Sequence, residues 1–119
     1  MTRATDVQAM QLGGDVSVVD LTPTPLTAAG QVGDWVRLSG RPAFLQVEIS
    51  DTTTPAAQVV FEVSNDRVAR TAKVWFTYDL TGSAPSNGDT TFSGAVWGRL
   101  RCVSISGVDA AVTGTLARS

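Results

Sequence analysis

The sequence of 119 residues contains no histidine and a single cysteine, Cys102. Without histidine, the chain lacks the side chain that most often transfers protons near neutral pH and most often binds transition metals. A lone thiol cannot close a disulfide within the chain, and without a neighbouring base it is a poor nucleophile. We therefore expect Cys102 to be buried and unreactive, and we expect a protein that is not an enzyme, with no catalytic site, no metal and no cofactor.

Basic residues are also scarce. Nine Lys and Arg stand against eleven Asp and Glu, which gives a formal net charge of −2 and a pI near 4.8. Binding to a phosphate backbone normally requires a basic stripe, so we expect no nucleic-acid partner. No apolar run approaches the roughly 20 residues that cross a bilayer, and the N-terminus lacks the basic start and apolar core of a secretory signal. We expect no membrane partner and synthesis in the cytoplasm without export.

What the sequence does contain is short stretches in which apolar and polar residues alternate. Leu45, Val47 and Ile49, for example, fall on one face of an extended chain and polar residues on the other. Seven strands are predicted, at residues 15–21, 35–39, 44–50, 58–64, 73–79, 97–105 and 110–116. This pattern is typical of an all-β, antiparallel two-sheet β-sandwich of about seven or eight strands, with a jelly-roll-like or immunoglobulin-like strand order.

The last two predicted strands, 97–105 and 110–116, flank a short Ser-Gly-Val-Asp turn. Two extended runs joined by so short a connection are typical of a β-hairpin, so we expect these strands to pair with each other. Residues 80–91 carry Gly82, Pro85 and Gly88 and show no periodicity. We expect them to form a long, exposed and mobile loop.

The N-terminal residues 1–33 are rich in Thr, Gly, Asp and Pro, and Leu21 and Leu26 flank two of the prolines. Proline cannot donate a hydrogen bond to a sheet, so this region is expected to be an edge strand or a crossing connection. We expect an N-terminal arm or edge-strand segment over residues 1–33 and a β-sandwich domain over 34–119. The arm either contacts a neighbouring subunit, through Leu21 and Leu26, or folds back along its own domain as a first strand.

Tryptophan and arginine provide the candidate binding residues. Trp75 and Trp97 align with charged residues on their strand faces, and Arg99 and Arg101 follow Trp97 on the same face. Either a bulge shifts the register near Arg99, or this face is turned towards solvent or a partner. Because Trp and Arg are favoured at interfaces, we expect Trp75, Trp97, Arg99 and Arg101 to contact another protein. The alternative is that the tryptophans, Trp35 included, belong to the core.

The only two glutamates, Glu48 and Glu62, lie on adjacent predicted strands and are placed to face each other across a sheet. Paired carboxylates of this kind can hydrolyse glycosides. Glutamates on the polar face of a strand are, however, ordinarily solvated surface residues. We interpret Glu48 and Glu62 as surface residues without a catalytic role.

Two stretches of the chain, VVFEVSND at 59–66 and WGRLRCVSISGVDAAVTGTL at 97–116, resemble small virion proteins of tailed double-stranded DNA bacteriophages. Capsid decoration or cement proteins with β-sandwich or jelly-roll folds are the most similar in kind. The resemblance carries no catalytic motif. It implies a protein that is made in the host cytoplasm and assembles on the virion surface, where it binds the major capsid protein and bridges neighbouring capsomers, often as a homo-oligomer such as a dimer or trimer.

A second function remains open at this point, which is a carbohydrate- or receptor-binding β-sandwich module of a phage tail, fibre or baseplate. Such a module would use an exposed Trp75 or Trp97 together with the loop at 80–91. A flat aromatic ring offers a large contact area at little entropic cost, which suits a sugar as well as a protein.

Overall fold

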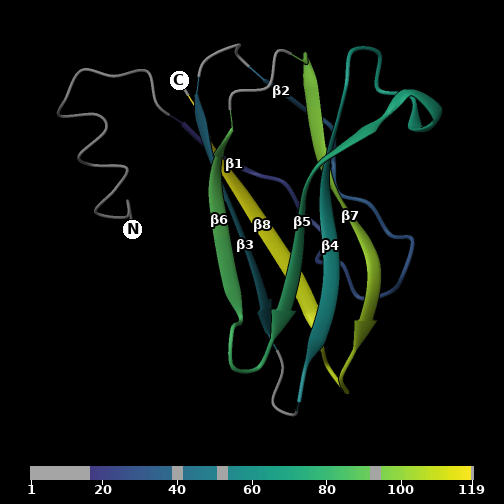
Figure 1. Ribbon diagram of the computed structural model, residues 1–119, viewed down its shortest axis with the longest axis vertical. Helices are drawn as coiled ribbons and strands as arrows, with labels where there is room; N and C mark the ends of the chain where they lie inside the picture. Colours follow the sequence, from purple (N-terminus) through teal and green to yellow (C-terminus); the bar gives the residue numbers. More distant parts are fainter. Residues whose placement is uncertain (1–16, 39–41, 51–53, 92–94, 119) are drawn as a thin grey trace, which may run out of the picture.

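The computed structural model describes residues 17–38, 42–50, 54–91 and 95–118, and within them the chain forms two antiparallel four-stranded sheets packed face to face (Figure 1). The predicted all-β sandwich is thereby confirmed. No helix in these residues is long and apolar enough to cross a membrane. The elements are β1 (Ser17–Asp20), β2 (Val36–Arg37), β3 (Ala43–Ser50), β4 (Ala56–Ser64), the 3-10 helix η1 (Ala69–Thr71), β5 (Lys73–Thr81), β6 (Ser86–Thr91), β7 (Trp97–Ser106) and β8 (Ala111–Arg118).

The strand order is that of a jelly roll. One sheet has the order β1-β8-β3-β6 and the other β2-β7-β4-β5, so β1 pairs with β8, β2 with β7, β3 with β6 and β4 with β5. Such nested pairing arises when one long antiparallel hairpin is rolled up into two layers. Only β4 and β5 are consecutive along the chain and also neighbours in one sheet, so every other connection between successive strands crosses from sheet to sheet.

The predicted hairpin of the last two strands is wrong. β7 pairs with β2 and β4, whereas β8 pairs with β1 and β3 in the opposite sheet. The physical reason lies in the core: Leu100 and Cys102 of β7 and Val112 and Leu116 of β8 are all fully buried. Placed in opposite layers, these two apolar rows cover each other, and the short connection at 107–110 serves as an arch between the sheets.

The predicted mobile loop at 80–91 is also wrong, because half of it is strand β6. Six residues with the sequence SNGDTT pair in register with β3, from Ser86 opposite Glu48 to Thr91 opposite Ala43. Asn, Gly and Asp have low intrinsic strand preference, so the sequence alone gives no strand signal here. The open edge of β3 supplies the hydrogen bonds that fix the segment.

Side chains alternate inward along the strands to fill the core. In β3, Leu45, Val47 and Ile49 are buried and their neighbours exposed, as predicted. The two layers are in close contact where Gly114 of β8 faces Leu100 of β7, since a Cβ atom on Gly114 would overlap the Cδ1 atom of Leu100. Glycine at position 114 therefore permits the close packing of the two sheets.

The N-terminal part of the described chain, residues 17–37, runs along the edges of both sheets, and we call it the edge segment. β1 pairs with β8, and Leu26 then exchanges two backbone hydrogen bonds of 2.9 Å with Val112 of β8. After a turn, residues 30–33 bond to the backbone of β7 in the other sheet, and β2 continues that pairing. The edge segment thus joins the two layers along one side of the sandwich.

Two leucines of the edge segment belong to the core. Leu21 and Leu26 are 0% and 1% exposed, so they offer no surface to a neighbouring subunit in this fold. The backbone N–H of Leu21 donates to the carbonyl of Gly114, and the N–H of Gly114 donates to the buried hydroxyl of Thr22 at 3.0 Å. These bonds fix the depth at which the two leucines enter the core.

The opposite side of the sandwich is bridged by the single tyrosine of the chain. The buried Tyr78 of β5 donates a hydrogen bond of 3.0 Å from its hydroxyl to Asp89 of β6. Burial, together with the hydrogen bond to Asp89 and its charge, raises the pKa of Tyr78 well above the ordinary value of 10.0. The unfolded chain therefore loses this proton at a lower pH than the folded chain does.

From this difference we expect stability to fall as pH rises above 10, by up to about 1.4 kcal/mol per pH unit, since only the unfolded state then releases the tyrosine proton. Tyr78→Phe should cost about 1 kcal/mol at neutral pH and should lack the part of the alkaline loss that Tyr78 contributes. Urea unfolding of both proteins from about pH 8 to about pH 11 measures this. The buried thiol of Cys102 is common to both proteins, so equal slopes of stability against pH would contradict the assignment to Tyr78.

Candidate protein-interaction surface

The outer face of the β2-β7-β4-β5 sheet gathers three of the predicted interface residues. Trp97, Arg99 and Arg101 point away from the core, because the buried residues of β7 alternate with them. Of the two arrangements considered for this strand, the outward-facing one is therefore correct. The register shift between β7 and β4 lies farther along, at Val103, which has no partner in β4.

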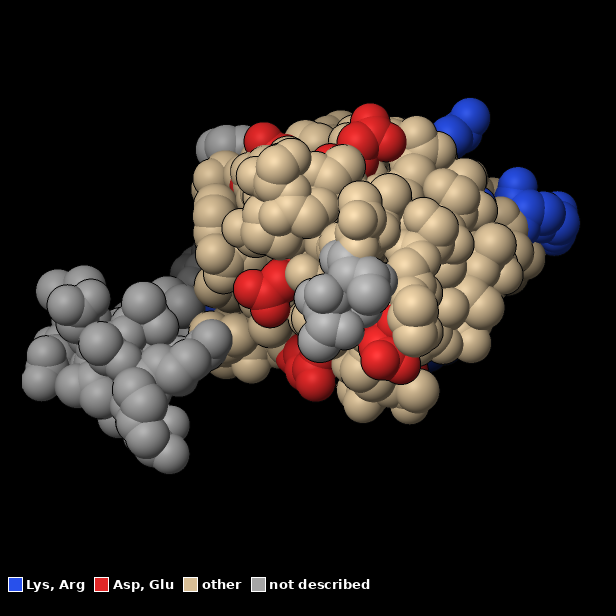
Figure 2. Space-filling model, turned by 90° about the horizontal axis from the view of Figure 1, so that it is seen from below, with Lys and Arg blue, Asp and Glu red and all other residues tan. Residues whose placement is uncertain are grey.

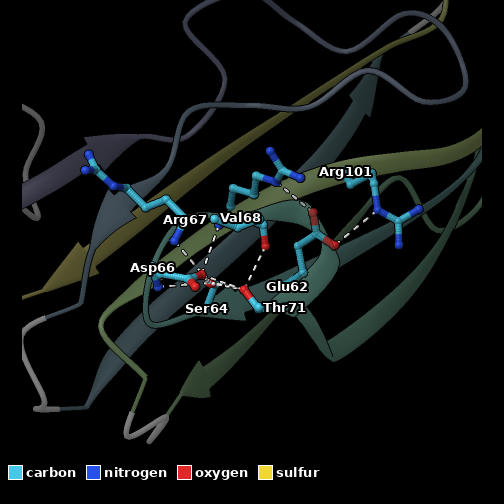
Figure 3. A network of polar contacts seen from close by, with 8 residues as sticks. Glu62, Ser64, Asp66, Arg67, Val68, Thr71 and Arg101 are labelled. Atoms are coloured by element: carbon cyan, nitrogen blue, oxygen red, sulfur yellow. Dashed lines mark hydrogen bonds and ion pairs between the residues drawn. The ribbon is translucent and has the colours of Figure 1, made fainter.

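Glu62 of β4 stands between two of these arginines (Figure 3). The Nε atom of Arg99 lies 2.7 Å from Oε1 of Glu62, and the Nε atom of Arg101 lies 3.2 Å from Oε2. Glu62 is only 4% exposed, so its interpretation as a solvated surface residue is wrong. It also does not face Glu48, because Glu48 lies on β3 in the other sheet. The two guanidinium groups thus replace the water that this buried carboxylate has lost.

Arginine side chains also cover two of the tryptophans. The Arg99 guanidinium carbon is 4.3 Å from the centroid of the Trp35 ring. That of Arg67 is 4.5 Å, and that of Arg37 5.9 Å, from the Trp97 ring. Each is within the range of a cation–π interaction. Trp97 and Arg99 are therefore engaged by neighbours within the chain, and they build a rigid face rather than a free binding group.

The connection between β4 and β5 is held by a compact network of polar contacts (Figure 3). The Thr71 hydroxyl lies 2.5 Å from the Asp66 carboxylate, and the Ser64 hydroxyl 2.8 Å from the same oxygen. The N–H of Val68 also donates to Asp66, at 3.2 Å. The bonds from Thr71 and Ser64 lower the pKa of Asp66 below its ordinary value. Arg67 adopts a left-handed φ of 61°, which carries its side chain over Trp97.

Next to this network in the chain are exposed residues that are apolar or basic, and we call them the β5 corner. Val68, Val74 and Trp75 are 37%, 50% and 46% exposed. The register between β4 and β5 shifts at this point, so that Trp75 has no partner in β4. Exposed Arg70 and Lys73 stand beside these residues in the chain. The β5 corner consists of Val68, Arg70, Lys73, Val74 and Trp75.

Positive charge is concentrated on this side of the molecule. In the view of Figure 2, Asp and Glu are scattered over the lower end of the sandwich, and Lys and Arg stand out at the right, where the β4–β5 connection lies in Figure 1. Six of the seven Lys and Arg residues in the described part of the chain belong to the β2-β7-β4-β5 sheet or to the β4–β5 connection, namely Arg37, Arg67, Arg70, Lys73, Arg99 and Arg101. The surface is thus suited to an acidic partner.

The other chemically notable residue is Cys102, which is fully buried as predicted. Burial raises the pKa of its thiol, which keeps it in the unreactive protonated form. No group of three or more Cys, Asp or Glu that could hold a metal ion occurs within the described residues.

The structure brings Trp97, Arg99 and Arg101 together on one face, with Trp75 at the edge of the same sheet. It does not bring the tryptophans together with the region at 80–91, because β6 belongs to the other sheet. Sequence reasoning missed Glu62 and Trp35 as partners of Arg99. Their roles depend on the pairing of β4 with β7, for which the sequence carries no local signal.

Comparison with known proteins identifies a shared fold. No protein-family profile and no curated protein matches the sequence. Among solved structures, the chain is similar to the crystal structure of SPBc2 prophage-derived protein YomS, with a TM-score of 0.55 and 13% sequence identity. The similarity covers 87% of this chain and 93% of that one. It therefore extends over nearly the whole sandwich.

Proposed function

We propose that the protein is a bacteriophage structural protein, and specifically a capsid decoration protein that binds the major capsid protein and bridges neighbouring capsomers. The observation that carries this proposal is the β5 corner, an exposed apolar and basic surface on a rigid base. The sandwich shared with a prophage-derived protein supports a phage origin, and jelly rolls are common in viral shells. Because a fold alone does not define a function, the proposal depends on the surface.

The β5 corner has the properties of a protein-docking site. Trp75 is 46% exposed and offers a large ring whose burial would contribute much of the binding energy. The hydrogen bonds of Ser64, Asp66 and Thr71 fix the neighbouring backbone before binding. Less conformational entropy is then lost on docking than would be lost by a mobile loop. Arg70 and Lys73 complement an acidic patch on the shell and speed association.

In this function the protein acts through its surfaces and carries out no reaction. We also propose that it acts as a homo-oligomer, a dimer or trimer, because an oligomer with closed symmetry presents several copies of the same surface to symmetry-related capsomers. The location is then the outer surface of the virion, reached after synthesis in the host cytoplasm.

The β5 corner can be tested with Trp75→Ala. We expect this change to weaken binding to empty capsids at least about 30-fold, which corresponds to the 2 kcal/mol that defines a central interface residue. Co-sedimentation of the purified protein with empty capsids of its phage measures the affinity. The folded state should persist, because Trp75 lies at a bulge in an edge strand and is half exposed.

Phe44→Ala is the matched control. Phe44 is 45% exposed, much like Trp75, but lies on β3 in the opposite sheet. We expect it to leave capsid binding unchanged. Equal losses of capsid affinity in both variants, or no loss in Trp75→Ala, would show that the β5 corner is not part of the interface. A wild-type protein that does not sediment with capsids would overturn the decoration function itself.

A further inference from the structure

The outer face of the β1-β8-β3-β6 sheet contains a shallow groove of about 270 Å³ that the proposed function does not use. Its lining comes from three adjacent strands and is polar except at its floor, which is formed by Val47 and Gly114. The Val47 side chain itself points into the core. So do the other side chains of β3 and β8 on that face of the sheet. The rim residues are Gln46, Glu48, Ser86, Thr113 and Thr115.

The register of the sheet places these rim residues in rows. Glu48 of β3 lies opposite Thr113 of β8 on one side and opposite Ser86 of β6 on the other. Gln46 lies opposite Thr115 in the next row that faces outward. A carboxylate, an amide and hydroxyl groups therefore stand about 4.8 Å apart across the sheet and about 7 Å apart along it.

These polar side chains have no partners among the described residues. Neither a hydrogen bond nor an ion pair is formed by the side chains of Gln46, Glu48, Ser86, Thr113 or Thr115 with the described part of the chain. The contrast with the other sheet is clear, since Glu62 there is bound by two arginines. The donors and acceptors of the groove are thus free for a ligand.

An exposed aromatic ring lies beside the rows. Phe44 precedes Gln46 on the outward face of β3 and is 45% exposed. Its ring reaches over the neighbouring strand, because a Cβ atom on Gly88 of β6 would be only 3.0 Å from the Cζ atom of Phe44. The absence of a side chain at Gly88 gives the ring room to lie near the sheet. It forms an apolar platform next to the polar groups.

The chemistry of the groove selects the class of ligand. No Lys or Arg lines it, and its one charge is the carboxylate of Glu48, so a phosphate, sulfate or acidic sugar would be repelled. Mixed donors and acceptors beside an aromatic platform match a ligand with many hydroxyl groups and an apolar face. The groove lies on the face of the sheet and not at its edge, so an added peptide strand would find no backbone partners.

We infer that this groove binds a neutral saccharide chain. Gln46 and Glu48 hydrogen-bond hydroxyl groups of one sugar ring, and Phe44 packs against the apolar face of the next. The site differs from the one considered on sequence grounds, which used Trp75 or Trp97, because those residues lie on the opposite sheet. A copy docked through the β5 corner would still carry this groove on its other sheet.

The test is a titration of the isotope-labelled protein, followed by amide chemical shifts. The probes are neutral hexasaccharides of glucose, mannose, galactose and N-acetylglucosamine, each at millimolar concentration, and an acidic hexamer of galacturonic acid. We expect at least one neutral probe to shift amides of residues 44–48, 86–88 and 113–115. Gln46→Ala should weaken the binding of that probe about tenfold, which is the loss of affinity expected for one good hydrogen-bonding group.

Gln58→Ala is the matched control, since Gln58 is an amide residue on β4 of the other sheet, and it should leave saccharide binding unchanged. The proposal is overturned if no neutral probe shifts the groove amides, if only the acidic hexamer does, or if Gln46→Ala binds as the wild type does. Capsid binding of Gln46→Ala should stay unchanged, so a failure here is distinguishable from a failure of the decoration function.

Discussion

Leu21→Ala is expected to lower the free energy of unfolding by about 2 to 5 kcal/mol, the range for removing a buried leucine from a packed core. Leu21 is fully buried, and its backbone is fixed to Gly114 of β8, so the surrounding side chains cannot easily close the cavity. A domain of this size is typically stable by only about 5 to 15 kcal/mol. This single substitution in the edge segment should therefore remove a large part of the free energy of unfolding.

Urea unfolding followed by tryptophan fluorescence measures the effect. Val32→Ala is the matched control in the same segment, because Val32 is 43% exposed, and it should change stability by no more than about 0.5 kcal/mol. A loss for Leu21→Ala as small as that of Val32→Ala would show that the edge segment is not an integral part of the sandwich.

Glu62→Ala is expected to cost about 2 to 4 kcal/mol, because it leaves two arginines without their shared carboxylate. Side-chain exposure is 6% for Glu62 and 13% for Arg99, so this ion pair is shielded from water. The Arg101 side chain is 35% exposed, so water can hydrate it once the carboxylate is gone. The expected loss of stability is therefore smaller than the largest losses known for broken buried ion pairs. Glu62→Gln retains the shape of the side chain without its charge, so its stability should lie between those of the wild type and Glu62→Ala.

The other glutamate of the chain provides the control. Glu48 lies on an exposed position of β3 and forms no ion pair with the described residues, so Glu48→Ala should change stability by no more than about 0.5 kcal/mol. Thermal and urea unfolding of the three variants compare the two sites directly. Equal effects of Glu62→Ala and Glu48→Ala would contradict a structural role for the arginine-bound carboxylate.

The sequence predicted the strands best where a strand has one face in the core and one in solvent. β3 is the clearest example, since its alternation of apolar and polar residues matches its alternation of buried and exposed side chains. The burial of Cys102 was predicted for a similar reason, because a small apolar side chain in an extended run suits the core. Periodicity of this kind is a local property, and the sequence records it directly.

The pairing of strands was not predictable in the same way. In a jelly roll nearly all successive strands lie in different sheets, so proximity in sequence misled the prediction for β7 and β8. β6 forms on residues with little strand preference because the edge of β3 needs hydrogen-bond partners. Both outcomes are decided by contacts between segments far apart in the chain.

In the candidate site, too, the features that follow from local periodicity were predictable and those that follow from strand pairing were not. Trp97, Arg99 and Arg101 share a face because they alternate along one strand, which the sequence predicted. Their engagement by Glu62 and Arg67 depends on the neighbouring strand and on the connection after it. The exposure of Trp75 depends on a bulge. The saccharide groove likewise arises from a register across three strands that no local pattern reveals.

Electron cryomicroscopy of the virion on which we propose that this protein assembles tests the central claim most directly. We predict density for the eight-stranded sandwich on the outer shell, with Trp75 and the rest of the β5 corner against the major capsid protein. Particles that lack this density, or that hold the sandwich with the β5 corner facing solvent, would contradict the account.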